Sequence, residues 1–507
     1  MIFILIFLSG WSLVRLLSRD FKLTEELALA MPIGLGLTSF LMFFINQLTH
    51  SITWGSIVVA LLIATLLLMS IRLYLDFKAN DLPWKRLVQK PDFSWLTLVW
   101  VVFASMITYL VYGILTKCMY WPPAEFDTIE GYDLLSKAIA REHILANSIL
   151  TNKDIVTGCG PRLLYPPLLA LCNSICYMTG METPKLINAL FFLSWVFIIY
   201  LLLRRFVTST AAILFTLLII VVPEMFAHAS FSLTNLPCAI YSSTAVISFV
   251  IWYEQRKEGF FYLSFVTIIF SSWTRSEAVL FVVPIMMLLF YRAIKEKQLK
   301  YLLIYGTTVL PYIVWTLFLK ANLAPAQTHY FNTTLTYNSV KLTNILAAAW
   351  GLMCKGDIYG LTFQIFIGFI FIGIIINIII DFKRNKYIVG GLILWIIVAM
   401  VLGIHIFTLL LFCAVLFAAC IVNEEHWTLL AIFFVALAGY TTIYYQVSDT
   451  DASLFAPGGW MQSGYKRGLF CYAPLALFYV ATSKWVIWLS EKLDKHLVLF
   501  AKPPIVS

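Results

Sequence analysis

The sequence contains few charged residues, and it has no long polar segment. Of its 507 residues, 12% are charged and 61% are hydrophobic, whereas about a quarter of the residues of a soluble domain are charged. Its mean hydropathy is +0.89. Apolar runs long enough to cross about 30 Å of hydrocarbon recur from Met1 to Leu489 and leave no room for a soluble domain of ordinary size. These shortages exclude a soluble protein and predict an integral membrane protein.

CxxC pairs are also absent, and most of the basic residues lie in short loops. The nine cysteines form no CxxC pair and mostly lie in apolar runs, where a free cysteine behaves as a small hydrophobe. The net charge of +9 comes mostly from short loops, as expected for residues that orient a membrane protein. The sequence therefore predicts a lipid bilayer as a partner and no nucleic acid.

Basic clusters predict which loops face the cytoplasm, because such loops carry an excess of Lys and Arg. The segment Tyr165–Gly180 tests this rule. If it crossed the membrane, every later basic loop would lie on the opposite side from the one that the rule predicts. With only about 16 residues and two prolines near its start, it is short for a span, and we interpret it as lying in the outer leaflet. The clusters are Arg15–Lys22, Arg72–Lys90, Arg204–Arg205, Arg256–Lys257, Arg292–Lys300, Lys383–Lys386 and Lys492–Lys495.

Successive loops alternate between the two sides of the membrane, so the positions of these clusters limit the number of spans. They predict an all-α, polytopic bundle of roughly 15 spans, plus or minus two, with amphipathic helices in the first large outer loop. Residues 1–94 form N-terminal spans without an assigned role, residues 95–489 form the main membrane domain, and residues 490–507 form a cytoplasmic tail. The predicted outer loops lie at about 116–184, 223–237, 271–277, 320–359 and 446–468.

Carboxylates gather in the first outer loop, in the stretch WPPAEFDTIEGYDLLSKAIAREH. From Thr128 onward its apolar residues recur at helical spacing, which predicts an amphipathic helix. Asp127 precedes that helix and Glu130 follows three residues later, as in a capping box. Asp133, with Lys137 four residues on, fits a solvated ion pair, and we interpret Glu142 as solvated too.

Asp127 allows a second interpretation, because capping and catalysis are compatible. A carboxylate at a helix N-terminus stays ionised and points in a fixed direction, as a general base requires. Its neighbours Glu125 and Glu130 are alternative bases. The residue pattern alone leaves the structural and catalytic roles of Asp127 open.

The order of several short motifs resembles the integral-membrane C-type (GT-C) glycosyltransferases. The similarity is closest to the protein O-mannosyltransferase and lipid A aminoarabinose transferase group and covers about Trp95 to Leu489. The motifs are EFDTIEGYDLLSKAIA, LLYPPLLAL, TNLP at Thr234–Pro237, TRSE at Thr274–Glu277 and GYKRGLFCYAPL at Gly464–Leu475. All of them fall in predicted outer loops or at their edges.

The resemblance implies an inverting enzyme that takes a sugar from a polyprenyl-phosphate donor at the extracytoplasmic face. It implies Asp127 as the base, and Arg275, Arg467 and Lys466 as ligands of the donor phosphate. Four further residues are implied in positioning the acceptor or the site, namely Tyr165, Glu277, Glu224 and Asn235.

The sequence departs from the family pattern at one position. Asn235 stands where an Asp is often found, which leaves a metal-assisted site without a clear ligand. Glu224, in the same loop, is the alternative second carboxylate. Neither His143 nor His228 has a partner at metal-ligand spacing. No cofactor is predicted, and dependence on a divalent metal stays open.

Two other functions stay open. A multi-span transporter or flippase would place ionisable residues near the membrane midplane and often contains internal repeats. An envelope-glycan polymerase or ligase would use a diphosphate-linked donor and cluster two or more arginines in one long outer loop. A bacterial protein of any of these classes would lie in the cytoplasmic membrane, and an enzyme would have its active face outside. The sugar, and whether the acceptor is a glycan, lipid or protein, are not predicted.

Overall fold

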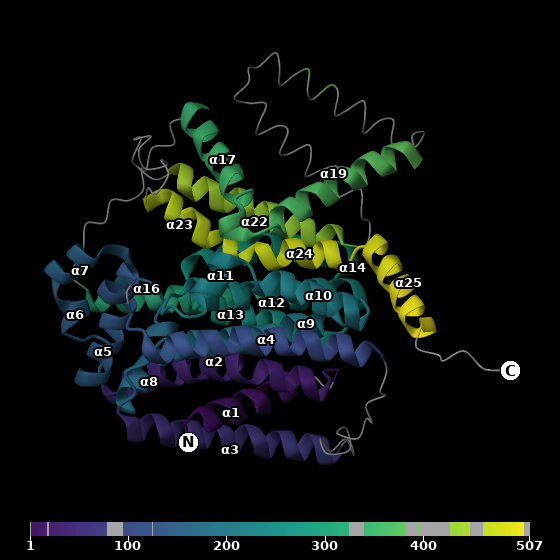
Figure 1. The fold of residues 1–507 in the computed structure, drawn as a ribbon. Helices are drawn as coiled ribbons and strands as arrows, with labels where there is room; N and C mark the ends of the chain where they lie inside the picture. The colour runs from purple at the N-terminus through teal and green to yellow at the C-terminus, as the bar shows by residue number, and fades with distance from the viewer. Residues whose placement is uncertain are drawn as a thin grey trace.

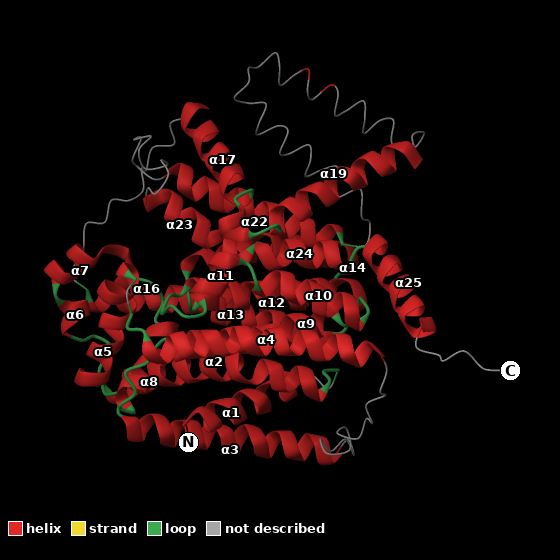
Figure 2. Cartoon of the chain, viewed as in Figure 1, coloured by secondary structure: helices red, strands yellow, loops and turns green. Residues whose placement is uncertain are grey.

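The computed structural model describes residues 2–17, 20–78, 95–123, 125–323, 339–380, 394, 397, 426–446 and 460–500. Within these residues every regular element is a helix (Figure 2). The predicted all-α class is therefore confirmed for the described part of the chain. The basic cluster predicted at Lys383–Lys386 lies outside the described residues.

The helices follow one another along the chain with short connections, and many lie side by side in Figure 1. The N-terminal part forms α1 (Ile2–Leu17), α2 (Leu23–Thr49), α3 (Trp54–Lys78) and α4 (Trp95–Tyr120). The first outer loop forms η2 (Thr128–Tyr132), α5 (Asp133–Glu142), α6 (Ser148–Thr151), α7 (Lys153–Cys159), η3 (Gly160–Leu163) and α8 (Leu168–Met178). Next come α9 (Leu186–Leu203), α10 (Ser209–Ile220), α11 (Pro223–His228), α12 (Asn235–Gln255), α13 (Glu258–Ser272), η4 (Ser276–Ala278) and α14 (Val279–Glu296).

The remaining elements complete the bundle. They are α15 (Lys300–Gly306), η5 (Thr307–Val309), α16 (Leu310–Asn322), α17 (Ser339–Met353), α18 (Gly356–Tyr359), α19 (Thr362–Ile380), α22 (Trp427–Gln446), α23 (Trp460–Gly468), η7 (Leu469–Cys471), α24 (Ala473–Ala481) and α25 (Lys484–Phe500). Helix α25 runs through position 490, where the predicted cytoplasmic tail begins, and the side of the membrane on which this tail lies stays a prediction.

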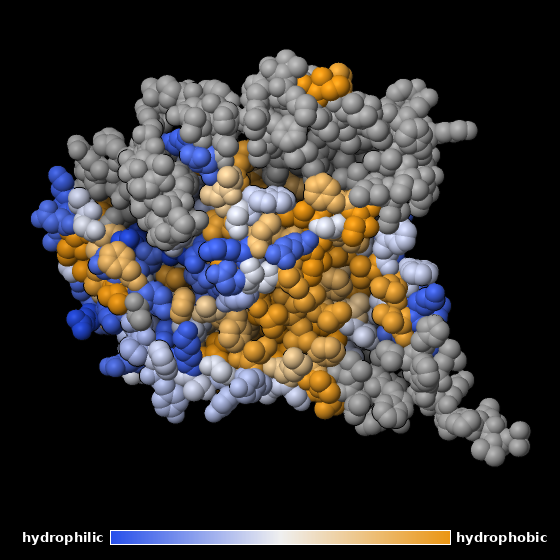
Figure 3. Space-filling model, turned by 45° about the horizontal axis from the view of Figure 1, so that its top comes forward, coloured by the Kyte–Doolittle hydropathy of each residue, from blue (hydrophilic) through white to orange (hydrophobic). Residues whose placement is uncertain are grey.

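Eight helices among the described residues are long and apolar enough to cross a membrane, or nine if the bent pair Ser463–Ala481 and Lys484–Lys495 is one span. Six further apolar helices are only 10–17 residues long. The predicted number of about fifteen spans is not confirmed. Figure 3 shows a broad hydrophobic surface beside hydrophilic residues that gather toward the end carrying α5–α7. The protein is a multi-span membrane protein.

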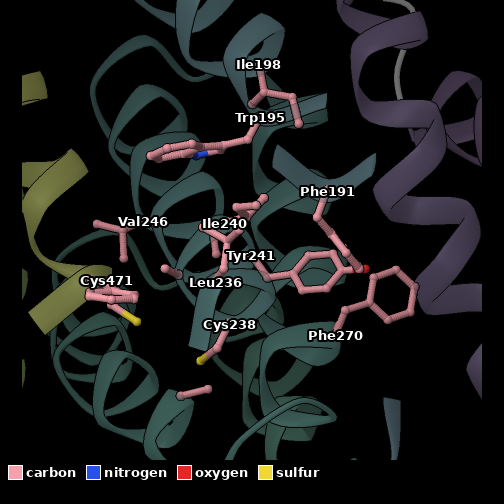
Figure 4. Packing of buried hydrophobic residues seen from close by; sticks show 14 of the residues in the cluster. Phe191, Trp195, Ile198, Leu236, Cys238, Ile240, Tyr241, Val246, Phe270 and Cys471 are labelled. Atoms are coloured by element: carbon pink, nitrogen blue, oxygen red, sulfur yellow. The ribbon is translucent and has the colours of Figure 1, made fainter. Parts of the chain in front are cut away.

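Helix α12 forms the centre of the bundle, because nearly all of its residues are buried. Figure 4 shows Tyr241 of this helix among the rings of Phe191 and Phe270, whose centroids lie 5.4 and 5.6 Å from its own. Its hydroxyl donates to the carbonyl of Pro32 at 2.6 Å, which satisfies a polar group that would be costly to bury alone. The contact joins α12 to α2.

The N-terminal helices pack closely with each other and with the rest of the bundle. A Cβ atom at Gly10 would lie 1.9 Å from the carbonyl oxygen of Ala30, and one at Gly34 would lie 2.0 Å from that of Ile6. Both positions therefore require glycine for α1 and α2 to approach each other. Since α2 also packs against α8 and α9, residues 1–78 are integrated into the main domain.

A buried cluster of charges ties α1, α2 and α3 together. Arg15 pairs with Glu26 at 2.9 Å and with Asp76 at 3.2 Å, and Arg72 lies 3.5 Å from each of the same two acids. Arg205 joins α2 through Glu25, at 2.6 Å. Three predicted cytoplasmic loops thus meet at one end of the bundle, opposite the end carrying α5–α7 (Figure 1).

The short segment after Tyr165 forms α8, which has only 11 residues. It is too short to cross the bilayer, as predicted. Its residues from Leu168 to Cys176 are buried, and it packs between α5 and α2. Protein therefore covers this segment, and its place in the outer leaflet stays a prediction.

Candidate functional site

Asp127 lies inside a helical turn in the first outer loop. Its backbone has φ −62° and ψ −27°, and its side chain makes no capping hydrogen bond. The helix starts one residue earlier, at Phe126, so the predicted capping box of Asp127 and Glu130 is wrong. The amphipathic helix itself is confirmed, as the π-helical turn η2 followed by α5. The carboxylate of Asp127 is free to point elsewhere.

Both oxygens of Asp127 are held by arginines. Arg162 donates from Nε to Oδ1 at 2.5 Å, and Arg467 of α23 donates from Nη1 to Oδ2. Burial alone would raise the pKa of Asp127, but the two arginines outweigh burial and hold that pKa below its ordinary value. Asp127 is therefore an ionised carboxylate clamped between two segments that are far apart in the sequence.

Arg162 is a site residue that the sequence analysis missed. Its guanidinium lies 4.5 Å from the centroid of the Phe126 ring, and its Nη1 donates to the carbonyl of Cys159 at 3.0 Å and lies 3.6 Å from Glu130. At Gly131, an added Cβ would lie 2.9 Å from the Cβ of Arg162. No local signal singled out Arg162, because the same predicted outer loop also carries Lys117, Lys137, Arg141 and Lys153.

Arg275 forms a second cationic centre, between α13 and η4. It bonds both carboxylate oxygens of Glu277, at 3.1 and 2.5 Å, in a bidentate pair. Its Nη1 donates to the Thr234 hydroxyl at 3.1 Å and its Nη2 to the Tyr165 hydroxyl at 2.9 Å. The Thr234 hydroxyl in turn donates to the hydroxyl of Tyr132 at 3.0 Å. Residues of three predicted outer loops thus meet at Arg275.

A small pocket brings the two cationic centres together. Its lining includes Arg275 and Glu277, Arg467 of α23, and Asn235 and Cys238 of α12. Its water-accessible volume is about 20 Å³, which is room for about one water molecule. A sugar or a phosphate group can enter only if the present ion pairs rearrange.

The other predicted site residues have partners of their own. Lys466 pairs with Glu224 at 2.5 Å, so the alternative second carboxylate is already neutralised by a neighbouring cation. Glu130 lies partly exposed near Arg162, and Glu125 has a buried oxygen without a hydrogen-bond partner. Of the three candidate bases, only Asp127 contacts Arg467 directly among the described residues.

Asp133 differs from its prediction as a solvated residue. It is 4% exposed, accepts a hydrogen bond from the hydroxyl of Tyr177, and pairs with Lys137 at 2.8 Å. Helix α8, which carries Tyr177, covers the side of α5 that the sequence pattern assigned to water. The prediction is wrong for Asp133, while Lys137 and Glu142 remain exposed.

The two histidines considered as metal ligands both have structural surroundings. His143 ends α5 with a left-handed φ of 57°, and its carbonyl accepts from the backbone of Ile52 at 2.5 Å. His228 is 2% exposed, and its ring lies edge-on to Phe470 at 4.7 Å. Burial lowers the pKa of His228, as do the nearby charges of Arg467 and Lys466, so the ring is neutral. No group of three or more His, Cys, Asp or Glu side chains in the described ranges is placed to hold a metal ion.

Gly468 positions Arg467 beside it. A Cβ atom at Gly468 would lie 1.8 Å from the Tyr440 hydroxyl oxygen, which also bonds the backbone of Gly464 at 3.2 Å. We therefore expect Gly468→Ala to push η7 and α23 away from α22 and to shift Arg467. Misplacing a site group by about 1 Å can cost up to about 10²-fold in rate. The rate of the reaction that this site supports should therefore fall at least about tenfold.

Initial rates of purified variants check this expectation. Gly158→Ala is the matched control, because nothing lies within 4 Å of an added Cβ there. If Gly468→Ala and Gly158→Ala both kept the parental rate, Gly468 would have no role in placing Arg467.

Comparison with known proteins does not assign the chain to a family. No family model matches it, and it has no significant match among curated proteins or solved structures. The fold and the apolar helices define a helical membrane protein with a charged site at one end of the bundle. The chemistry of that site is the basis of the function proposed next.

Proposed function

We propose that this protein is a glycosyltransferase that moves a sugar from a polyprenyl-phosphate donor to an acceptor at the extracytoplasmic face of the membrane. One observation supports the proposal more than any other. Asp127, Arg275 and Arg467 lie in three segments that are distant in the sequence, yet Arg467 both holds Asp127 and shares a pocket with Arg275. A carboxylate beside two arginines can accept a proton on one side and stabilise a leaving phosphate on the other.

In the proposed reaction an acceptor oxygen forms a bond to the anomeric carbon while the bond from that carbon to the phosphate oxygen breaks. Asp127 takes the proton of the acceptor hydroxyl. The phosphate leaves with the bonding electron pair, and Arg275 and Arg467 neutralise its growing charge. Because attack and departure occur on opposite faces, the sugar configuration inverts.

The ion pairs around Asp127 constrain this reaction. A carboxylate with both oxygens bound to arginines is a poor base, so one oxygen has to be released first. A donor phosphate that binds Arg467 competes with Asp127 for the same guanidinium. Donor binding would thus free one oxygen of Asp127 while Arg162 keeps the other in place.

Arg162→Gln tests the role assigned to Asp127 through the pH dependence of the rate. Asp127 acts as a base only when ionised, so activity is lost as the pH falls through its pKa. Arg162 and Arg467 lower this pKa, whereas Glu130 is a nearby anion. Removing Arg162 should raise the pKa of Asp127, so the acidic limb of the kcat profile should move to higher pH.

Lys153→Gln, on the exposed surface of α7, is the control for a lost positive charge. A merely structural role of Arg162 would lower the rate at every pH and leave the acidic limb in place. That result would contradict the assignment of Asp127 as the base.

A second candidate is a polymerase or ligase that uses a diphosphate-linked donor. The long outer loop 320–359 contains no arginine, which argues against this candidate. In the fold, however, Asp127 pairs with both Arg162 and Arg467, and Arg467 shares a pocket with Arg275. A diphosphate carries more negative charge than a phosphodiester and would use more cations. A transporter is less favoured, because the buried ion cluster of Arg15, Glu26, Arg72 and Asp76 lies toward the helix ends.

The proposal is tested by incubating the purified protein with radiolabelled donors. One series carries different sugars on polyprenyl phosphate, and a second carries the same sugars on polyprenyl diphosphate. We expect consumption of one member of the first series and release of polyprenyl phosphate, lost in Asp127→Asn. Consumption from the second series alone would favour the second candidate, and consumption of neither would refute both.

A further inference from the structure

A large groove lies between the end of α4 and α5. Its volume is about 670 Å³, within the range of roughly 300–1,000 Å³ typical of ligand pockets. One wall is the end of α4 and the following turn, Cys118–Pro123, and the other is the face of α5 carrying Lys137, Ala140 and Arg141. Tyr177, Glu182 and Thr183 complete the lining. None of these residues lines the arginine pocket.

Internal contacts hold the shape of this α4–α5 groove. Lys185 is buried, and its ammonium group donates to the carbonyls of Lys117 and Pro122, at 3.3 and 3.5 Å. These bonds hold the end of α4 and its turn in place. On the other side, the buried carboxylate of Asp133 accepts from Tyr177 and Lys137. Both walls are therefore fixed without any ligand.

Two charged groups of the groove remain uncommitted. Arg141 and Glu182 are both exposed, and neither has a hydrogen-bond or ion-pair partner within the part of the chain that the structure describes. Trp121 and Tyr120, at 67% and 79% exposure, place aromatic surface beside them. A fixed groove thus combines aromatic surface with one free guanidinium and one free carboxylate.

We infer that the α4–α5 groove binds a saccharide, namely the sugar portion of the acceptor; this identification rests on the proposed function. A sugar has apolar C–H faces that pack on aromatic rings and hydroxyl groups that both donate and accept hydrogen bonds. A guanidinium and a carboxylate satisfy such hydroxyls from opposite sides.

The charge of the groove favours a saccharide over an anionic lipid head group. Lys137 and Arg141 are balanced by Asp133 and Glu182, so the groove has no excess of positive charge for a phosphate. An aromatic belt at the membrane surface explains exposed Tyr and Trp side chains, but not a charged wall facing them across a groove. The wall residue Pro123 lies four positions before Asp127 in the sequence, so the groove and the proposed base belong to the same outer loop.

The inference is tested by saturation-transfer NMR on the full chain in phosphatidylcholine nanodiscs. The probes are free mannose, glucose, xylose and N-acetylglucosamine, with glycerol 3-phosphate standing in for a lipid head group. We expect at least one sugar to bind the parental protein. Trp121→Ala and the double variant Arg141→Gln with Glu182→Gln should each weaken that binding about tenfold, as expected when charged hydrogen-bond partners or a stacking surface are lost.

Two control proteins locate the binding site. The double variant Lys153→Gln with Asp154→Asn removes an exposed opposite-charge pair from α7, outside the groove lining, and should bind like the parent. Asp127→Asn should also bind like the parent, because Asp127 does not line the groove.

Several outcomes would overturn the inference. These are no sugar binding at all, binding that the groove variants leave unchanged, binding lost in Asp127→Asn, or binding of glycerol 3-phosphate alone. The outcome is independent of the proposed enzymatic activity. If no donor is consumed but sugar binding maps to the groove, the glycosyltransferase proposal fails and the saccharide site stands.

Discussion

Asp127→Asn is expected to lower kcat by about 10²-fold or more, because it removes the proposed base. The substitution is nearly isosteric, and Asn tolerates the helical turn in which Asp127 lies. The amide keeps an oxygen that can accept from Arg162 or Arg467, so the loop should hold its place. What it removes is a negative charge and the ability to accept a proton.

The same change should tighten donor binding. In the parental protein the carboxylate of Asp127 occupies Arg467, and a donor phosphate has to compete with it. A neutral amide competes less well than a carboxylate, since a hydrogen bond to an ion is about twice as strong as one between neutral groups. The dissociation constant of the donor should therefore fall while turnover collapses. Single-turnover rates and equilibrium binding of the same radiolabelled donor separate the two effects.

Asp154→Asn is the matched control, because Asp154 is an exposed acid in the same outer loop; its kcat should change less than about threefold. Asp133→Asn is unsuitable for this purpose, because Asp133 is buried beneath Tyr177. Glu125→Gln and Glu130→Gln test the alternative bases. If one of these abolished turnover while Asp127→Asn retained it, the base would be misassigned. Full activity in all three would refute the proposed mechanism.

The composition and the spacing of apolar residues were sufficient to predict the helical membrane class. Mean hydropathy and runs of apolar residues are local properties, so they do not depend on which helices later become neighbours. The same holds for the amphipathic helix after Thr128, where the three- and four-residue spacing is visible in a short window. Span number was harder to predict, because α8 and five other apolar helices are shorter than a span, and a hydropathy window does not separate them from crossings.

The site was harder to predict, because its contacts are long-range. The bond between Asp127 and Arg467 joins residues 340 positions apart, and no local pattern encodes such a pair. Arg162 was missed although it lies directly before the LLYPPLLAL motif. Asp133 was assigned to water because its own helix has a polar side there, but the covering helix α8 starts 35 positions later in the chain. Burial of a polar side depends on such neighbours.

Arg275 is the residue for which we expect the second large effect. Its guanidinium makes a bidentate pair with Glu277 and also donates to Tyr165 and Thr234. Arg275→Ala should lower kcat by about 10²-fold or more, because it removes one of the two cations assigned to the leaving phosphate. Arg275→Lys keeps a positive charge but loses the planar fork, so its loss should be smaller.

Folding has to be separated from chemistry in this experiment. Arg275→Ala leaves the partly buried carboxylate of Glu277 without its partner, which is destabilising in itself. The double variant Arg275→Gln with Glu277→Gln replaces the ion pair by two neutral amides and avoids this cost. If the double variant unfolds at the parental temperature yet turns over donor at the low rate of Arg275→Ala, the loss belongs to the chemistry.

The single variant Glu277→Gln tests how the negative charge of Glu277 affects donor binding at Arg275. It leaves Arg275 in place but removes the anion that neutralises it, so a donor phosphate should bind more tightly to a less compensated cation. The dissociation constants of the donor for Glu277→Gln, Arg275→Lys and the parental protein give the readout. Parental donor affinity and parental kcat in folded Arg275→Ala would show that Arg275 ties Tyr165, Thr234 and Glu277 together as a structural residue, and that the donor phosphate is bound elsewhere.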